Sequence, residues 1–438
     1  MKISRMFLIM FFVLFHVNAY ALDIAEHTLE NGLKVLILED HKAPTATFQI
    51  WYRVGSRDEN TGKTGLSHLL EHMMFKGTKK YGPKTFSQTI QRAGGTDNAF
   101  TSKEYTGYFE LLASDRIGLP IELEADRMQN LVLTKDAVLS ERDVVTEERR
   151  LRYDDDPQSL VYEQVMAVAF NNHPYRWPVI GWMSDLKTLN PDDLINHYRT
   201  YYAPNNAVVI VVGDVKKEDI VAKVEAAFGN IPAGQEIKTI KIEDEEQIGE
   251  RRFYVRKEAE LPFIVSAYKV PDIKHEHGFA LDVLGSILSD GKSSRLYQRL
   301  VYEQQLALSA WAGYEGLYKD PFLFLTGATA ASGKNIEDVE KAINDEIEKI
   351  KKEPPSEQEV QKAKNQIEAS FIMGQDSIYM QARMIGTFEM IGGWRLWDRY
   401  LAGVRKVSPE DVRRVAEKYL VPDKRTTGIL IPLKDNKK

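Results

Sequence analysis

The sequence predicts an α+β fold of two tandem homologous domains, each an antiparallel-rich sheet covered by helices. In the N-terminal half, strand-like segments come first and helical segments follow, which is the order typical of α+β domains. A segment near residue 190 recurs near residue 408 at a constant spacing, as expected of a duplicated domain. The length of 438 residues gives room for two or three domains of ordinary size.

The first 21 residues have the composition of a targeting segment. Lys2 and Arg5 precede an apolar run of 11 residues, Phe7 to Val17, and the small-residue cleavage site Ala19-Tyr20-Ala21 follows. The run is too short to cross a bilayer, which takes about 20 residues. We therefore expect a signal peptide over residues 1–21, cleaved after Ala21, and a mature protein that is periplasmic or secreted. An uncleaved anchor is the alternative.

Composition excludes several classes of protein and of site. The chain has no cysteine, which rules out a lipoprotein anchor, disulfide bonds and thiolate zinc ligands. The net charge is only −6 and no basic cluster with interleaved aromatic residues occurs, so we expect no nucleic-acid partner. A hydrophobic content of 43% supports a large buried core.

The first domain is predicted over residues 22–232. Asn31-Gly32 favours a hairpin turn within residues 27–38, and the β-branched and aromatic run 45–54 is typical of a strand. Gly94-Gly95 ends a short helix over 85–93. The remaining elements are expected in this order: an edge strand at 94–101, a strand at 105–112, helices at about 114–129, 136–152, 157–170 and 191–202, a strand at 208–212 and a helix near 216–228. We expect the helices on one face of the sheet.

A polar linker is predicted over residues 233–250, followed by a second domain over residues 251–438. The charge run Glu243 to Glu246 in the linker is expected to be solvated. The second domain repeats the first at an offset of 218 (408 − 190): Asn190 to Leu194 matches Ser408 to Val412, Tyr201 matches Tyr419, and Pro204 matches Pro422. Each copy is an N-capped helix that leads through a proline turn into a strand.

Residues 65–78 carry the candidate chemistry, because they include His68-Leu69-Leu70-Glu71-His72. Two histidines four residues apart share one face of a helix and can both reach one zinc ion. Glu71 is placed to take a proton from water at such a site. By composition this pattern should occur roughly 0.03 times in a chain like this one, so the match is moderately specific. A solvated or core-capping histidine pair is the plain alternative.

A third ligand is available in the predicted helix Ser140 to Arg149. Glu141 and Glu148 lie seven residues apart on one stripe of that helix. Glu147 is a competing candidate, although it points about 100° away from the stripe. Glu148 follows His72 by 76 residues (148 − 72).

This pattern resembles the inverted-motif zinc proteases, the pitrilysin and mitochondrial processing peptidase family. The resemblance implies that His68, His72 and Glu148 hold one Zn²⁺ and that Glu71 is the catalytic base. It also implies that Glu141 orients one of the ligands without binding the metal itself. The alternative for Glu141 is a plain surface charge. The register of the family favours Glu148 over Glu147.

The resemblance extends over nearly the whole mature chain. It includes Gly94 to Thr101, Tyr201 to Ala207, and Ser293 to Leu296 in the second half. It implies a zinc endopeptidase that hydrolyses peptides or unfolded segments in a closed chamber, as one half of a clamshell. Substrate would add to the strand that contains Asn98, Ala99, Phe100 and Thr101 by main-chain hydrogen bonds, whereas an ordinary sheet strand is the alternative.

The second copy is expected to have no zinc site. Leu281, Leu284 and Gly285 stand where the first copy has His68, Glu71 and His72, and none of the three can bind the metal.

The resemblance also implies a dimer, because proteins of this family place two such tandem halves face to face. The facing half often carries an Arg and a Tyr that grip the substrate backbone. Here that pattern falls on Leu300 to Leu308, where Val301 replaces the Arg and Leu308 replaces the Tyr. Arg295 and Tyr302 are also seven residues apart, but they lie six residues before the expected positions and are a minor alternative. We therefore expect a heterodimer with a zinc-less homologous subunit, and a homodimer is the simpler alternative.

Two other function classes compete with an active protease. One is a non-catalytic core or scaffold subunit that retains the zinc motif, and the other is a peptide-binding chaperone. The intact set of His68, Glu71, His72 and Glu148 argues against both.

Overall fold

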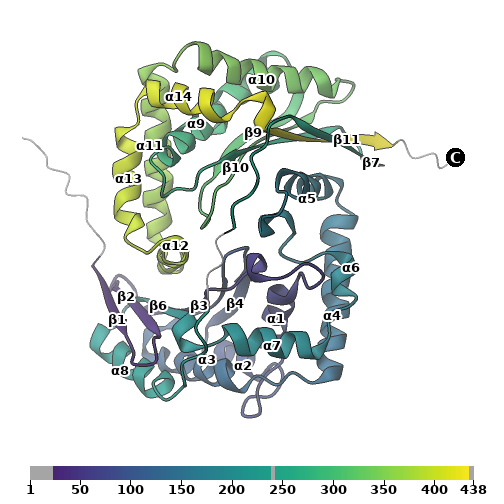
Figure 1. Ribbon diagram of the computed structural model, residues 1–438. Coiled ribbons are helices and arrows are strands. Elements are labelled where there is room, and N and C mark those ends of the chain that lie inside the picture. Colours follow the sequence, from purple (N-terminus) through teal and green to yellow (C-terminus); the bar gives the residue numbers. More distant parts are fainter. Residues whose placement is uncertain (1–22, 238–241, 434–438) are drawn as a thin grey trace, which may run out of the picture.

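The two halves of the chain each build one sheet, and the sheets lie one above the other (Figure 1). The computed structural model describes residues 23–237 and 242–433. The predicted signal peptide, residues 1–21, lies outside the described residues, as does part of the predicted linker. None of the helices in the described ranges combines the length and hydrophobicity needed to cross a bilayer.

The first sheet has six strands in the order β1-β2-β6-β3-β5-β4. Their bounds are β1 (Ile24–Thr28), β2 (Lys34–Glu39), β3 (Thr45–Tyr52), β4 (Thr96–Thr101), β5 (Thr106–Ala113) and β6 (Ala207–Gly213). Only β2 and β6 pair in parallel, which confirms an antiparallel-rich sheet. The hairpin turn lies where predicted, with Gly32 at φ 86°. β6 is buried along its whole length, which explains its unbroken apolar sequence.

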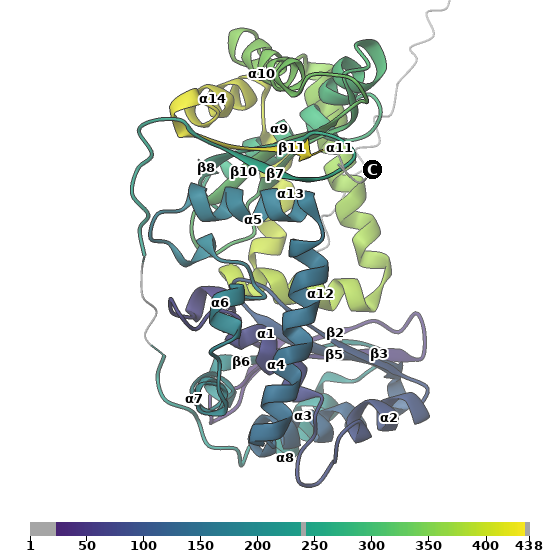
Figure 2. The ribbon, with the colours of Figure 1, turned by 90° about the vertical axis from the view of Figure 1, so that its right-hand side faces the viewer.

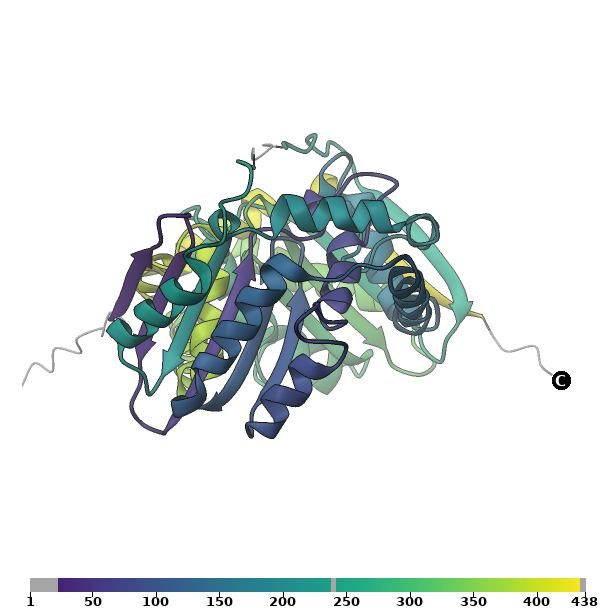
Figure 3. The ribbon, with the colours of Figure 1, turned by 90° about the horizontal axis from the view of Figure 1, so that it is seen from below.

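The described part of the first half contains eight α-helices, and all of them except α5 lie on the outer side of this sheet (Figure 3). They are α1 (Leu66–Met74), α2 (Thr85–Arg92), α3 (Gly118–Asn130), α4 (Lys135–Arg149), α5 (Pro157–Ala169), α6 (Met183–Leu186), α7 (Pro191–Tyr201) and α8 (Lys217–Phe228). α4 continues as a wider π turn over Arg150–Asp154. The four-residue α6 is not predicted from the sequence, because it is too short to show a hydrophobic period.

The second sheet has five strands in the order β7-β11-β8-β10-β9. Its elements are β7 (Arg251–Glu258), β8 (Phe263–Val270), β9 (Ala307–Glu315), β10 (Phe322–Ala330), β11 (Arg425–Leu433), α9 (Gly278–Ser289), α10 (Ile336–Lys352), α11 (Glu357–Met373), α12 (Ile378–Ile391), α13 (Leu396–Lys406) and α14 (Pro409–Tyr419). Helices α9, α10 and α14 cover its outer face (Figure 1).

The predicted duplication is confirmed in three dimensions. Helices α7 and α14 each begin with a capping box, Asn190 with Asp193 and Ser408 with Asp411, and each leads into a central strand. α9 packs beside the edge strand β9 as α1 packs beside the edge strand β4. The side chains of Leu281 and Leu284 are fully buried in α9, so this helix offers no ligand at those positions.

Each sheet is also covered on its inner face, by a helix from the other half (Figure 2). Val161 and Val165 of α5 pack with Phe263 and Val265 in the core of the second half. In return, α12 packs on β3 and β6, and a Cβ on its Gly386 would lie 2.3 Å from the Trp51 ring. The expectation of helices on one face of the sheet is therefore wrong, because the halves exchange helices.

The linker contacts both halves of the chain through one acidic residue, Asp244. Asp244 accepts hydrogen bonds from the backbone N–H groups of Asn171, Asn172 and His173, and it pairs with Lys269. Its side chain is only 9% exposed. The prediction that the charge run is solvated is wrong for Asp244, because a loop that presents several free N–H groups binds a carboxylate.

Candidate metal centre

Helix α1 has one buried face and one face turned toward a cavity. Four apolar side chains lie in the core of the first half: Leu69, Leu70, Met73 and Met74. The side chains of His68, Glu71 and His72 are half-buried. This division follows from the 3.6-residue period of the helix.

The start of α1 is fixed by a buried carboxylate. Both oxygens of Glu59 accept backbone hydrogen bonds of 2.7 Å, from the N–H groups of Gly65 and Ser67. Gly65 has φ 92°, and a Cβ there would lie 2.5 Å from the carbonyl oxygen of Ile180. These contacts fix the position and direction of the helix that presents the two histidines.

His68, His72 and Glu148 meet at one point, with one ligand atom from each lying within 4.8 Å of the others. The Oε2 atom of Glu148 is 3.8 Å from Nε2 of His68 and 3.4 Å from Nε2 of His72. A zinc ion about 2.1 Å from each of three tetrahedral ligands would hold those atoms about 3.4 Å apart. The donor set and its spacing therefore fit zinc and leave a fourth position for water or substrate.

Glu141 and Glu147 have different surroundings, although both are in α4. Glu141 is buried, and its Oε1 lies 3.0 Å from Nδ1 of His72 while its other oxygen pairs with Lys76. A hydrogen bond at Nδ1 leaves Nε2 of His72 free to bind a metal. Glu147 is 62% exposed and pairs with Arg150, away from the ligand group.

The pKa shifts of His68 and Glu148 suit metal binding, whereas a metal ion at His72 has to displace a proton. Burial and the neighbouring His72 lower the pKa of His68 to about 4, which keeps that imidazole neutral. The hydrogen bond from His72 holds the pKa of Glu148 below its ordinary value, so that this carboxylate is ionised. Burial lowers the pKa of His72, but its hydrogen bonds to Glu148 and Glu141 outweigh burial and raise it.

Glu71 stands beside the ligands and keeps a raised pKa. Burial raises the pKa of its carboxyl, and the hydrogen bond that Thr101 donates, 2.5 Å from Oγ1 to Oε2, partly offsets this effect. A carboxylate with a pKa moved toward neutrality is a better proton acceptor at physiological pH.

The predicted substrate strand forms one wall of the same cavity. β4 is the edge of the first sheet, and within the described residues it pairs only with β5. The cavity holds about 440 Å³ and is lined by the three candidate ligands, Glu71, Asn98, Ala99, Phe100, Thr101, Arg152, Tyr153, Val179 and Ile180. The last four are not predicted from the sequence. Arg152 could have been found one helical turn after Glu148, whereas no local signal marks Val179 and Ile180.

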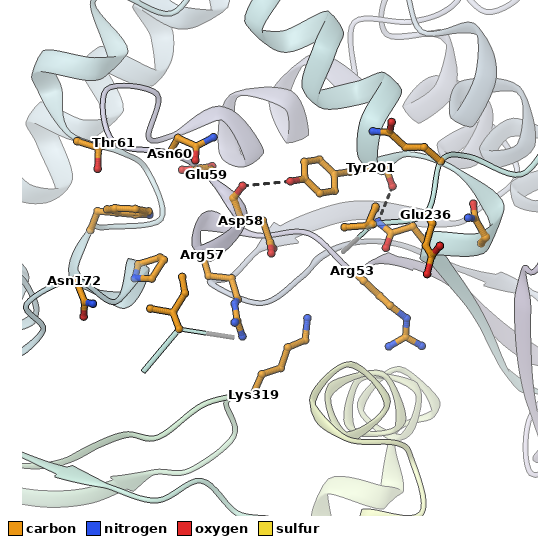
Figure 4. Close-up of a pocket in the computed structure, with 17 residues that line it drawn as sticks. Arg53, Arg57, Asp58, Glu59, Asn60, Thr61, Asn172, Tyr201, Glu236 and Lys319 are labelled. Carbon is orange, nitrogen blue, oxygen red and sulfur yellow. Dashed lines mark hydrogen bonds between the residues drawn. The ribbon is translucent and has the colours of Figure 1, made fainter. Parts of the chain in front are cut away.

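A larger cavity of about 640 Å³ lies at the junction of the two halves and the linker (Figure 4). Arg53, Arg57 and Lys319 line it, and each is paired with a buried carboxylate. Glu59, which binds the N-terminal end of α1, also lines it. None of the predicted zinc or substrate residues lines this cavity, so it is separate from the candidate metal centre.

Comparison with known proteins gives matches over both halves. Residues 34–181 match the family described as Insulinase (Peptidase family M16), and residues 188–367 match the Peptidase M16 inactive domain. The chain is 33% identical over 422 residues to the zinc protease PqqE of Helicobacter pylori, which covers 95% of each chain.

Solved structures give the same picture. The crystal structure of a protease from Helicobacter pylori matches with a TM-score of 0.91 at 33% identity, over 94% of this chain and 100% of that one. The periplasmic protease PqqL from Escherichia coli matches in fold, with a TM-score of 0.77 at 18% identity. That match covers 94% of this chain but only 49% of PqqL, so the present chain corresponds to half of that longer molecule.

Proposed function

The chain belongs to peptidase family M16, and from this premise we propose that it is a zinc-dependent endopeptidase that cleaves peptides or unfolded segments. The observation that carries the proposal is the convergence of His68, His72 and Glu148 within 4.8 Å, with Glu71 beside them. Relatives named as zinc proteases support the same function.

His68, His72 and Glu148 would hold the metal. Zinc, when bound, supplies a Lewis acid for the scissile carbonyl and for the attacking water. Glu71 takes the proton from that water and then passes it to the leaving amine. Thr101 fixes the Glu71 carboxylate through their hydrogen bond, and Glu141 fixes the ring of His72.

The edge strand β4 would hold the substrate. The N–H group of Ala99 bonds to Oδ1 of its neighbour Asn98, 2.8 Å away, at an exposed position. An extended peptide that displaced this local bond would add to the sheet as a further strand. The backbone would then be held beside Glu71, with little dependence on side-chain sequence.

We propose export to the periplasm and association with a second half. The signal peptide predicted over residues 1–21 supports export, and the similar PqqL is named as periplasmic. The match to half of PqqL supports a facing half supplied by another subunit. Arg295 is held by Glu359 through two bonds of 2.8 and 3.1 Å, which disfavours a substrate role for Arg295 with Tyr302.

The test is a digest of a peptide library by the purified chain, with and without a chelator, analysed by mass spectrometry. We expect cleavage that the chelator abolishes and that added zinc restores. Stoichiometric zinc with no hydrolysis, alone or with a partner, would instead favour the non-catalytic subunit or the peptide-binding chaperone.

A further inference from the structure

Arg152 is the one Lys or Arg among the residues that line the candidate zinc cavity in the described part of the chain. It lies in the π turn that follows α4, four residues after Glu148. Its side chain is 69% exposed at the cavity rim. A cation in this position faces whatever occupies the cavity.

The two oxygens of Glu148 face different neighbours. Oε2 faces the two histidines, while Oε1 lies 3.0 Å from Nη2 of Arg152. An arginine carries five N–H donors in a planar fork. Within the described residues, the Nε and Nη1 atoms of Arg152 have neither a hydrogen bond nor an ion pair. Most of the fork is therefore free to bind a further acceptor.

The neighbouring arginines show that this exposure is specific to one position. Arg149 is buried and bound through both terminal nitrogens to Glu163. Arg150 pairs with Glu147 and does not line the cavity. Of these three arginines, only Arg152 combines a largely unpaired guanidinium with a place in the lining of the candidate zinc cavity, which residues of β4 also line.

We infer that Arg152 binds a carboxylate of the substrate, so that peptides with a negative charge close to the scissile bond are preferred. A planar guanidinium matches a carboxylate through two parallel hydrogen bonds, here from the second N–H of Nη2 together with Nε or Nη1, which a neutral carbonyl cannot reproduce. The carboxylate belongs either to an Asp or Glu side chain or to a free C-terminus. The inference rests on the proposed peptidase function and adds its substrate class.

The experiment compares matched peptides that carry Glu, Gln or Lys at each scanned position, with free and with amidated C-termini. The wild-type protein should cleave the Glu peptides with kcat/KM about 5-fold above the Lys peptides, the size expected of an exposed charge pair. Arg152→Glu should reverse this order, and Arg152→Gln should remove it. A preference that survives amidation identifies a side-chain carboxylate, and one lost on amidation identifies the terminus.

Arg150→Gln is the matched control, because Arg150 is a nearby exposed arginine outside the cavity, and it should keep the wild-type preference. Equal loss for all peptides in an Arg152→Gln variant that still binds one zinc per chain, or no charge preference in the wild type, would overturn the inference. If no peptide is cleaved at all, the proposed function fails, and fluorescence anisotropy with labelled Glu and Lys peptides still decides whether Arg152 binds a carboxylate.

Discussion

Glu141 contacts His72 on the side away from the candidate metal position, and its contribution can be measured separately from that of the ligands. Its hydrogen bond to Nδ1 fixes the orientation and tautomer of the ring. We predict that Glu141→Gln lowers zinc affinity on the order of tenfold, because the charged acceptor is lost while the ligand set remains. Competition with a chromogenic chelator measures this change.

Glu147→Gln is the control for that measurement, since Glu147 lies on the same helix but is exposed and paired with Arg150. Its zinc affinity should equal that of the wild type. A large loss in Glu147→Gln together with unchanged affinity in Glu148→Gln would move the ligand role to Glu147.

The residues of the site differ in how far a sequence reveals them. His68, Glu71 and His72 are neighbours on one helix, so their spacing alone brings them together. Identifying Glu148 as the third ligand depended on the resemblance to the family, because spacing alone does not distinguish it from Glu147. Val179 and Ile180 reach the cavity only through the path of the chain after α5, which has no local signature.

At the scale of elements, β4 is the edge strand to which the substrate is proposed to bind. The N–H group of Ala99 bonds to the side chain of Asn98 at an exposed position. We predict that Ala99→Pro raises KM or abolishes cleavage while the domain stays folded, because one outward N–H donor is lost. Peptide kinetics, together with circular dichroism and the melting temperature, check this prediction.

Ala99→Ser serves as the control, since serine keeps the N–H group at that position. Its KM should stay close to the wild-type value. Wild-type kinetics in a folded Ala99→Pro variant would show that substrate does not use this edge.

The order and type of most elements are predictable because their signals are local. Gly32 and the capping boxes of α7 and α14 mark turns and helix starts within a few residues. The exchange of α5 and α12 between the halves is not predictable in this way. An amphipathic face shows that a helix is buried, but not which sheet buries it.

At the scale of the whole molecule, Glu26 on β1 ties the two halves together. Its carboxylate accepts hydrogen bonds from Nε1 of Trp394 and from Arg395, and pairs with Lys34. These contacts, the Trp394 bond foremost, lower the pKa of Glu26 from 4.5 to about 2. The stabilisation is therefore present above pH 4.5 and is lost as the pH falls from there toward 2.

We predict that Glu26→Gln lowers the free energy of unfolding at pH 7 by up to about 1 kcal/mol, a small value because the pair is partly exposed. The difference from the wild type should shrink below pH 4.5 and vanish near pH 2. Denaturant unfolding at a series of pH values measures it, and a difference that grows on acidification would contradict the assignment.

A second whole-molecule prediction concerns the facing half. Leu308 is 61% exposed on β9, and neither it nor Val301 can hydrogen-bond a peptide carbonyl. We predict that the chain alone is weakly active and that a zinc-less homologous partner raises kcat/KM, since contacts to the transition state are restored. Sedimentation and kinetics of the chain with and without partner measure both points. Full activity from a homogeneous single-chain preparation would reject the heterodimer.

The most direct test of the account measures zinc content and peptide hydrolysis in the same preparations of the wild type and Glu71→Gln. Because His68, His72 and Glu148 are unchanged, both proteins should bind one zinc per chain. Hydrolysis by Glu71→Gln should fall on the order of 10²–10⁴-fold, since the general base is lost. An unchanged turnover rate in pure Glu71→Gln, with zinc bound, would contradict the assignment of Glu71 as the base and with it the proposed mechanism.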